Sequence, residues 1–113
     1  TTGQVATDSI AELLDRLSAE LPAAKLAGHF HDTNHQAIAN VTEALSYGLR
    51  RFDSAIAGLG GCPYAPGAKG NVNTKALHDA LAAAGWQTGL DRDKLVAAEQ
   101  IVTTMGLNKA ESR

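Results

Sequence analysis

Residues 25–56 read KLAGHFHDTNHQAIANVTEALSYGLRRFDSAI, in which two strand-like stretches flank a helical one. Residues 25–30 are largely apolar and lie between a proline and a turn-forming Asp-Thr-Asn, so we predict a short β-strand there. Residues 35–48 carry apolar side chains at helical spacing and end at a glycine, which predicts a helix. Residues 51–56 predict a second strand. This order favours parallel pairing of the two strands.

Helices are also predicted on both sides of this unit, at residues 8–21, 74–84 and 91–105. The first has Thr7 as its expected N-cap, and the last begins after Asp91 and is expected to bury Leu95, Val102 and Met105. Two parallel strands are too few for a sheet that is covered on both faces, and a complete (β/α)₈ barrel has about 250 residues. We therefore predict an α/β fold in which residues 1–113 form one incomplete unit. It is either the C-terminal portion of a (β/α)₈ TIM barrel or a chain that depends on a partner.

The composition narrows the classes of function and the location. The chain has 113 residues, of which 44% are hydrophobic, so it can bury the core of one small domain. Its net charge of −2 gives no electrostatic footprint for nucleic acid or an anionic membrane, and no apolar run approaches the roughly 20 residues that span a bilayer. A single cysteine and a first segment without a signal-peptide pattern favour the cytoplasm or an organelle matrix over secretion. Because no methionine begins the chain, we expect a piece of a longer protein.

Two histidines and an asparagine are candidate metal ligands. His29 and His31 are two residues apart on the first predicted strand, so their side chains share a face at its carboxyl end, where barrel enzymes carry their sites. Two imidazoles can hold one divalent metal, although strand histidines can also simply hydrogen-bond to neighbours. Asn71 offers an oxygen suited to Mg²⁺ or Mn²⁺, and its alternative reading is turn chemistry after Gly70.

The only cysteine, Cys62, lies in a glycine-dense loop directly after the second predicted strand. Gly58, Gly60 and Gly61 allow the backbone of this loop to approach a ligand closely. One interpretation of Cys62 is a small buried hydrophobic side chain. The other is a functional thiol, either a nucleophile with a lowered pKa or a proton donor that stays neutral near the working pH.

Four further polar side chains have weaker signals. Asp53 could orient a ligating histidine or serve the structure alone, and Lys69 could contact an anionic ligand. His35 and His78 stand in helical context, where we expect them to be solvated.

Three segments together resemble the 3-hydroxy-3-methylglutaryl-CoA lyase family: His29-Phe30-His31-Asp32-Thr33, Ala57-Gly58-Leu59-Gly60-Gly61-Cys62-Pro63-Tyr64-Ala65 and Gly70-Asn71. The resemblance extends from about residue 1 to about residue 105. The glycine–cysteine segment is its specific part, because it is similar to that family's signature around a catalytic cysteine. The His-x-His pair is shared with related metal-dependent barrels, namely isopropylmalate and homocitrate synthases, the carboxyltransferase domain of pyruvate carboxylase and hydroxy-oxovalerate aldolases.

The resemblance implies a (β/α)₈ barrel of which this chain supplies the last helices and strands seven and eight. It implies that His29, His31 and Asn71 bind a divalent metal, Mg²⁺ or Mn²⁺, and that His29 also takes part in proton transfer. Cys62 would be catalytic on a loop that closes over an acyl-CoA substrate. The implied reaction is the retro-Claisen cleavage of 3-hydroxy-3-methylglutaryl-CoA to acetyl-CoA and acetoacetate.

The chain also departs from the family pattern. The arginine and aspartate of that family's first barrel strand have no counterpart in a matching context here, so we expect the 113 residues alone to be inactive. His35 stands where a glycine is expected. Two alternatives stay open: a related synthase or aldolase on the same barrel, and a non-catalytic fragment. Exposed strand edges would favour self-association or a homodimer.

Overall fold

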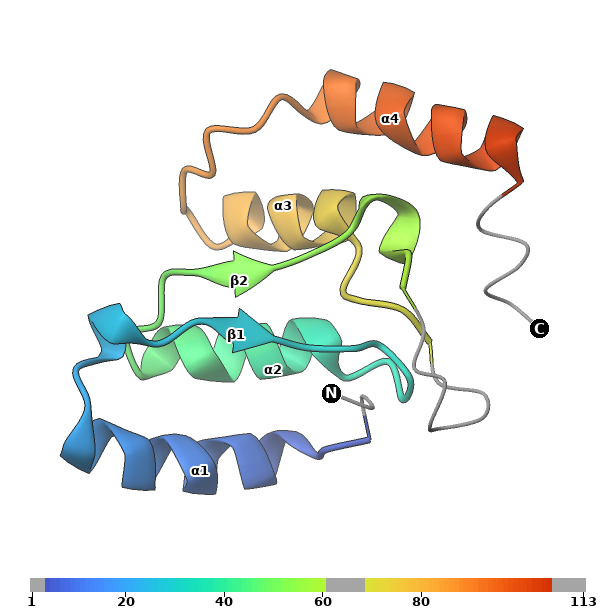
Figure 1. The fold of residues 1–113 in the computed structure, drawn as a ribbon. Helices are drawn as coiled ribbons and strands as arrows, with labels where there is room; N and C mark the ends of the chain where they lie inside the picture. Colours follow the sequence, from blue (N-terminus) through green and yellow to red (C-terminus); the bar gives the residue numbers. More distant parts are fainter. Residues whose placement is uncertain (1–3, 61–68, 107–113) are drawn as a thin grey trace.

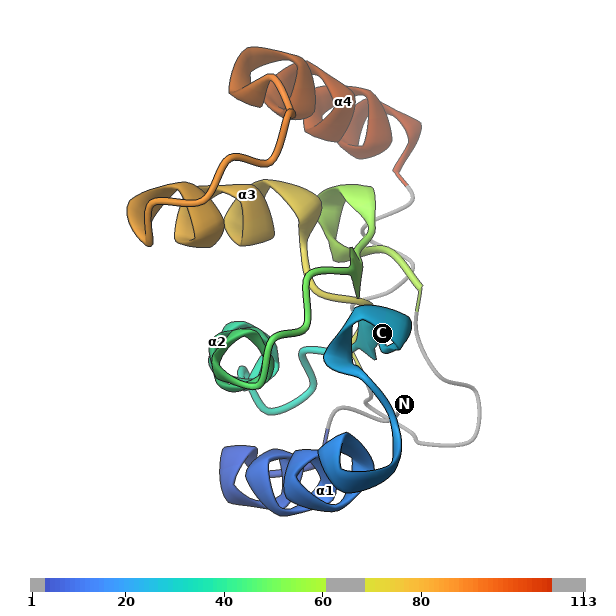
Figure 2. The ribbon, with the colours of Figure 1, turned by 90° about the vertical axis from the view of Figure 1, so that its left-hand side faces the viewer.

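The computed structural model describes residues 4–60 and 69–106. Its helices are α1 (Thr7–Glu20), α2 (Ala37–Ser46), α3 (Thr74–Ala83) and α4 (Arg92–Met105), and its strands are β1 (Gly28–His29) and β2 (Phe52–Asp53). Two short 3₁₀ helices, η1 (Ala23–Lys25) and η2 (Ile56–Gly58), lie before β1 and after β2. In Figures 1 and 2, α1 and α4 lie on opposite sides of the described structure, and α2, the two strands and α3 lie between them.

The two strands are parallel and are joined through α2, as the sequence predicts. Gly28 pairs with Phe52 and His29 with Asp53. Both strands are shorter than predicted, because a third segment takes over the backbone hydrogen bonds beyond their carboxyl ends. Residues 71–73 form this segment: Asn71 bridges His31 in antiparallel fashion, and Asn73 bridges Ala55 in parallel fashion. At the other end, Lys25 is the last residue of η1 and does not belong to the strand predicted for residues 25–30.

The core has two clusters that share α2. Ile10, Leu14, Ala44 and Leu49 pack between α1 and α2, and Ala37, Val41, Val72 and Leu77 pack between α2 and α3. Phe30, directly after β1, and Phe52 of β2 contact both clusters. Helix α2 is therefore the central helix, and its burial holds the carboxyl ends of the strands in place. Among the described residues, no helix has both the length and the apolar character needed to span a membrane.

The structure confirms the predicted N-cap of α4, whereas the predictions for Thr7 and Met105 are wrong. Asp91 caps α4 by accepting hydrogen bonds from the backbone N–H groups of residues 93 and 94, as predicted. Thr7 is not the N-cap of α1 but its first residue, since its hydroxyl donates to Asn40 Oδ1 at 2.9 Å. Leu95 and Val102 are buried as expected, whereas Met105 is 64% exposed because it is the last residue of α4 and lies beyond the last buried residue of that helix.

Candidate metal centre

The two histidines of the candidate site lie side by side at the carboxyl end of β1. Their ring centroids are 5.3 Å apart. His31 is buried, with 7% of its surface exposed, while the side chain of His29 remains 44% exposed. The alternation of a strand thus directs both imidazoles to one face, with the inner ring fixed by its surroundings and the outer ring accessible.

Hydrogen bonds define which ring nitrogen of each histidine carries the hydrogen. His29 Nδ1 lies 3.0 Å from Asp53 Oδ2, and His31 Nδ1 lies 2.9 Å from the backbone carbonyl of Lys69. A carboxylate and a carbonyl can only accept, so each Nδ1 carries the hydrogen, and the neutral ring then has its lone pair on Nε2. Metal-ligating histidines are typically oriented in this way by a carboxylate or a carbonyl.

Asn71 contributes an oxygen atom for which the described residues provide no hydrogen-bond partner. Its Nδ2 donates to the Leu59 carbonyl at 3.0 Å, which fixes the orientation of the amide. Its Oδ1 is buried and finds no hydrogen-bond partner among the described residues. A buried acceptor left in this state costs about 1–3 kcal/mol, so a donor or a cation at Oδ1 would stabilise the fold.

The two imidazoles and the amide oxygen form a donor set that suits a divalent cation. The backbone bridge between His31 and Asn71 brings Asn71 to the end of β1 that carries the histidines. Within residues 4–60 and 69–106, no group of three or more histidine, cysteine, aspartate or glutamate side chains could hold a metal, so the set depends on the amide. Amide oxygen suits Mg²⁺ and Mn²⁺, and two imidazoles together with one oxygen suit several divalent ions.

Glycines make the close approach of the loop to Asn71 possible. Gly58 and Gly60 have φ values of +70° and +96°, and a Cβ at Gly60 would lie 2.8 Å from Asn71 Nδ2. A Cβ at Gly70 would lie only 1.8 Å from the Gly58 carbonyl oxygen. The sequence analysis identified Gly58 and Gly60 as loop residues but did not predict the structural role of Gly70. The position of Gly70 directly before Asn71 could have indicated that role. Gly61 and Cys62 lie outside the described residues.

The remaining polar candidates divide between the site and a separate pocket. His35 is exposed as expected but lies before α2, in a turn with φ +56°, a value that favours the expected glycine. Lys69 Nζ lies 3.2 Å from His35 Nε2, where it can donate a hydrogen bond.

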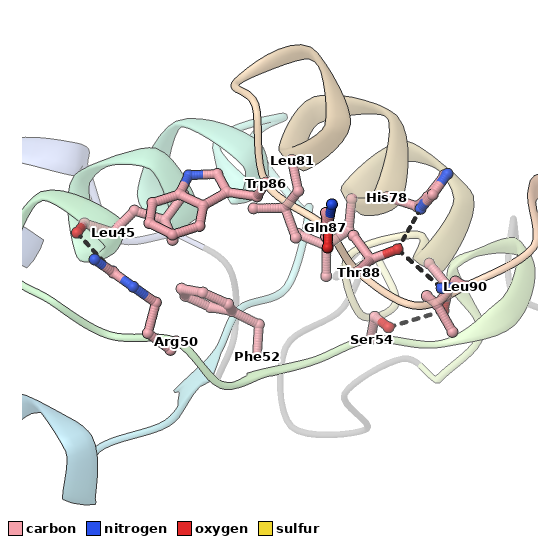
Figure 3. Close-up of a pocket in the computed structure, with 12 residues that line it drawn as sticks. Leu45, Arg50, Phe52, Ser54, His78, Leu81, Trp86, Gln87, Thr88 and Leu90 are labelled. Carbon is pink, nitrogen blue, oxygen red and sulfur yellow. Dashed lines mark hydrogen bonds between the residues drawn. The ribbon is translucent and has the colours of Figure 1, made fainter.

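His78 is not simply solvated, because its Nδ1 lies 2.7 Å from Thr88 Oγ1. It lines a cavity of about 360 Å³ in which Arg50 stacks over Trp86 at 4.4 Å (Figure 3). That cavity is lined by none of the three candidate metal ligands.

Parallel strands joined by a helix, with nitrogen and oxygen donors at their carboxyl ends, define an α/β chain with its candidate site at the ends of the strands. The family model described as HMGL-like matches residues 1–102, and the chain belongs to this family.

Named relatives are lyases of greater length. The chain is 54% identical over 91 residues to hydroxymethylglutaryl-CoA lyase of Pseudomonas mevalonii, covering 80% of this chain and 30% of the relative. It is 47% identical over 95 residues to the mitochondrial hydroxymethylglutaryl-CoA lyase of Arabidopsis thaliana, covering 84% of this chain and 20% of the relative. The chain therefore spans about a third or less of the length of these relatives.

Solved structures agree. The HMG-CoA lyase of Brucella melitensis superposes with a TM-score of 0.88 at 47% identity, covering 93% of this chain and 37% of that chain. An HMG-CoA lyase of Acinetobacter baumannii, in complex with coenzyme A and 3-methylmalate, has a TM-score of 0.85 at 34% identity, covering 94% of this chain and 35% of that chain. The chain is thus an α/β fragment that matches about a third of an HMG-CoA lyase chain.

Proposed function

We propose that this chain is the metal-binding C-terminal portion of an HMG-CoA lyase barrel, with β1 and β2 as strands seven and eight. In the full-length protein, the reaction is the cleavage of 3-hydroxy-3-methylglutaryl-CoA to acetyl-CoA and acetoacetate. The observation that carries the proposal is the buried Oδ1 of Asn71, which has no hydrogen-bond partner among the described residues, near two imidazoles whose Nδ1 atoms face acceptors and whose lone pairs are therefore on Nε2. That combination supports a metal-assisted cleavage by the full-length protein.

His29, His31 and Asn71 would hold the divalent cation, Mg²⁺ or Mn²⁺. When bound, such a cation polarises oxygen atoms of the substrate and lowers the cost of forming an alkoxide. His31 suits the role of a metal ligand that takes no part in proton transfer, because it is buried and its Nδ1 is held by the Lys69 carbonyl. Asn71 suits an oxygen ligand, since its amide nitrogen is already held by the Leu59 carbonyl.

His29 has the surroundings of a group that can also take up a proton. Its side chain is the more accessible of the two, and the Asp53 carboxylate lies against its Nδ1. A carboxylate at that position orients the ring and would stabilise the imidazolium that forms when Nε2 accepts a proton, which Nε2 can do only while it does not bind the cation. We assign His29, in that state, to removing the proton of the substrate's tertiary hydroxyl, which starts the cleavage of the carbon–carbon bond.

Cys62 completes the proposed reaction from outside the described residues. When the bond breaks, its electron pair passes to the thioester fragment, and the tertiary carbon becomes the ketone carbon of acetoacetate. The resulting acetyl-CoA enolate needs a proton on carbon, and the thiol of Cys62 is assigned to donate it. Gly58, Gly60 and Gly61 belong to the loop that brings this thiol over the substrate, and closure of such a loop excludes water.

An acyl-CoA thioester is therefore the proposed substrate. A relative's structure contains coenzyme A, and relatives are named as cytoplasmic or mitochondrial enzymes, which supports a cytoplasmic or organelle-matrix setting. Among the described residues, β1 and β2 pair with each other and with no third strand. The open edges support association with the rest of a barrel or with a second copy of the chain.

The test is lyase turnover in the full-length protein with added Mn²⁺. Cys62→Ser is expected to reduce kcat by about 10²-fold or more while leaving the unfolding midpoint nearly unchanged, because proton transfer by a positioned group contributes about 10²–10⁴-fold. The 113-residue chain alone is expected to show no turnover. Unchanged kcat in Cys62→Ser would remove the assigned role of Cys62, and condensation of an oxo-acid with acetyl-CoA in place of cleavage would favour the synthase or aldolase alternative.

A further inference from the structure

Helix α4 contacts the segment that presents Asn71, although none of the candidate metal ligands lies on this helix. We infer that Glu99 of α4 is a positioning residue for the Asn71 amide, acting through Asn73. The inference deepens the proposed function, because it rests on Asn71 as a metal ligand, but the position of the amide can be measured without a metal.

The Glu99 carboxylate connects α4 to the first turn of α3. Its Oε1 accepts a hydrogen bond from Asn73 Nδ2 at 2.9 Å, and its Oε2 lies 2.8 Å from Lys75 Nζ. Only 18% of the Glu99 side chain is exposed, and Lys75 is 31% exposed. Both carboxylate oxygens are therefore engaged by groups that lie two and four residues after Asn71.

Asn73 transmits this contact to Asn71. Its Oδ1 accepts from the backbone N–H of Ala76 as the N-cap of α3, so the amide is held at both its oxygen and its nitrogen. The backbone at Asn73 is extended and bridges Ala55. In extended backbone, side chains two residues apart share a side, so Asn71 and Asn73 are on one side while Val72 enters the core on the other. A change in the backbone at Asn73 thus changes the direction of the Asn71 side chain.

The same helix also contacts the loop on which the Asn71 amide rests. Helix α4 packs against η2, whose last residue is Gly58, and the next residue supplies the carbonyl that accepts from Asn71 Nδ2. Figure 1 shows α4 running alongside α3. Helix α4 therefore contacts both the segment that carries Asn71 and the loop whose carbonyl accepts a hydrogen bond from the Asn71 amide.

Glu99 is charged at neutral pH despite its partial burial. Burial is the largest single effect and acts to raise the pKa of the Glu99 carboxyl, but the hydrogen bonds from Lys75 and Asn73 and the positive charges of Lys75 and Arg92 together hold the pKa below its usual value. A charged acceptor makes a stronger hydrogen bond to Asn73 than a neutral one would.

A second ion pair between α3 and α4 provides a matched control. Arg92 of α4 donates from Nε and Nη2 to the carboxylate of Asp79 in α3, at 2.9 and 3.2 Å. This pair also joins α3 to α4 through opposite charges. It makes no hydrogen bond to Asn73, so its loss weakens the α3–α4 contact without reaching Asn71 directly.

The experiment compares Glu99→Ala, Glu99→Gln and Asp79→Ala in the full-length protein by NMR. In the metal-free protein, the side-chain amide resonances of Asn71 and Asn73 are expected to shift in Glu99→Ala and to stay at the wild-type positions in Asp79→Ala. In a titration with Mn²⁺, broadening of the His29 and His31 ring resonances is expected to show about tenfold weaker binding in Glu99→Ala, as is typical when a partner of a metal ligand is lost. Asp79→Ala is expected to change the affinity less than twofold.

Glu99→Gln separates the hydrogen bond from the charge and keeps the test valid if Glu99→Ala fails to fold. Glutamine retains an oxygen that accepts from Asn73 but loses the ion pair with Lys75, so the Asn71 amide is expected to stay near its wild-type position. The inference is overturned if Glu99→Ala leaves the Asn71 amide unchanged, or if Asp79→Ala shifts it equally. Absence of Mn²⁺ binding in the wild type would instead remove the metal-binding part of the proposed function, and the metal-free amide shifts would still decide the role of Glu99.

Discussion

Substitution of Gly70 by alanine tests how the loop and the Asn71 segment fit together. A Cβ at this position would lie 1.8 Å from the Gly58 carbonyl oxygen, 2.8 Å from the Leu59 carbonyl carbon and 2.9 Å from the Gly58 carbonyl carbon. All three are backbone atoms, so no rotation of a side chain relieves the clash. To reach an ordinary contact of 3.4 Å, the two segments must separate by about 1.6 Å, the difference between 3.4 and 1.8 Å.

The magnitude follows from what that separation breaks. Asn71 donates to the Leu59 carbonyl from both its backbone N–H at 3.3 Å and its Nδ2 at 3.0 Å. Each lost hydrogen bond costs about 1 kcal/mol, and inserting a methyl group into a packed site costs about 1–3 kcal/mol. The smaller entropy of the unfolded alanine chain offsets about 0.5–1 kcal/mol. We expect Gly70→Ala to lower the free energy of unfolding by about 3 kcal/mol.

The assay is urea unfolding of the 113-residue chain, with Gly85→Ala as the matched control. At Gly85 a Cβ would meet nothing within 4 Å, but φ is +89°, so the control carries only the conformational cost of alanine. We expect the control to lose about 1 kcal/mol. For a slope of about 1.5 kcal/mol per molar urea, Gly70→Ala lowers the midpoint by about 2 M.

The refuting result is a Gly70→Ala protein whose stability equals that of Gly85→Ala. That outcome would mean that the Gly58 loop and the Asn71 segment do not touch in solution. A second refuting result is an unchanged position of the Asn71 side-chain amide resonances in Gly70→Ala, because the predicted separation removes the hydrogen bond of that amide to Leu59.

Three further predictions concern the surroundings of the site. Asp53→Ala removes the acceptor at His29 Nδ1 and is expected to weaken Mn²⁺ binding by about 10–100-fold in an NMR titration; an unchanged affinity would show that the contact does not orient the ring. The folded-state pKa of Glu99 is lowered from 4.5, so its contribution to stability is present above that value and is lost as pH falls through the folded-state pKa. The difference in urea midpoint between the wild type and Glu99→Gln is therefore expected to shrink below pH 4.5, and a pH-independent difference would contradict this. His35→Gly relieves the φ of +56° but loses an exposed contact with Lys69, so its unfolding free energy is expected to lie within about 1 kcal/mol of the wild type; a loss above 2 kcal/mol would assign that contact a larger role.

Local patterns predicted most of the secondary structure and the histidine pair. Asp91 caps α4 as predicted, because capping involves only the side chain and the next few N–H groups. The shared face of His29 and His31 follows from the alternation of a strand alone. The predictions for Thr7, Met105 and His78 were wrong because each depends on a neighbour elsewhere in the chain: Thr7 on Asn40, Met105 on what α4 packs against, and His78 on Thr88.

The amino-acid sequence by itself determined the strand–helix–strand order, the pair of imidazoles and the resemblance to a family of lyases, because these depend on residue types at short spacing. The tertiary structure alone decided that each Nδ1 faces an acceptor, that Asn71 Oδ1 is buried without a partner among the described residues, and that Glu99 accepts a hydrogen bond from Asn73. Those features arise from contacts between residues that are 12 to 38 positions apart in the chain. Only the packing of α2 and α4 around the ends of the strands brings such residues together, and no local spacing in the sequence encodes that distance.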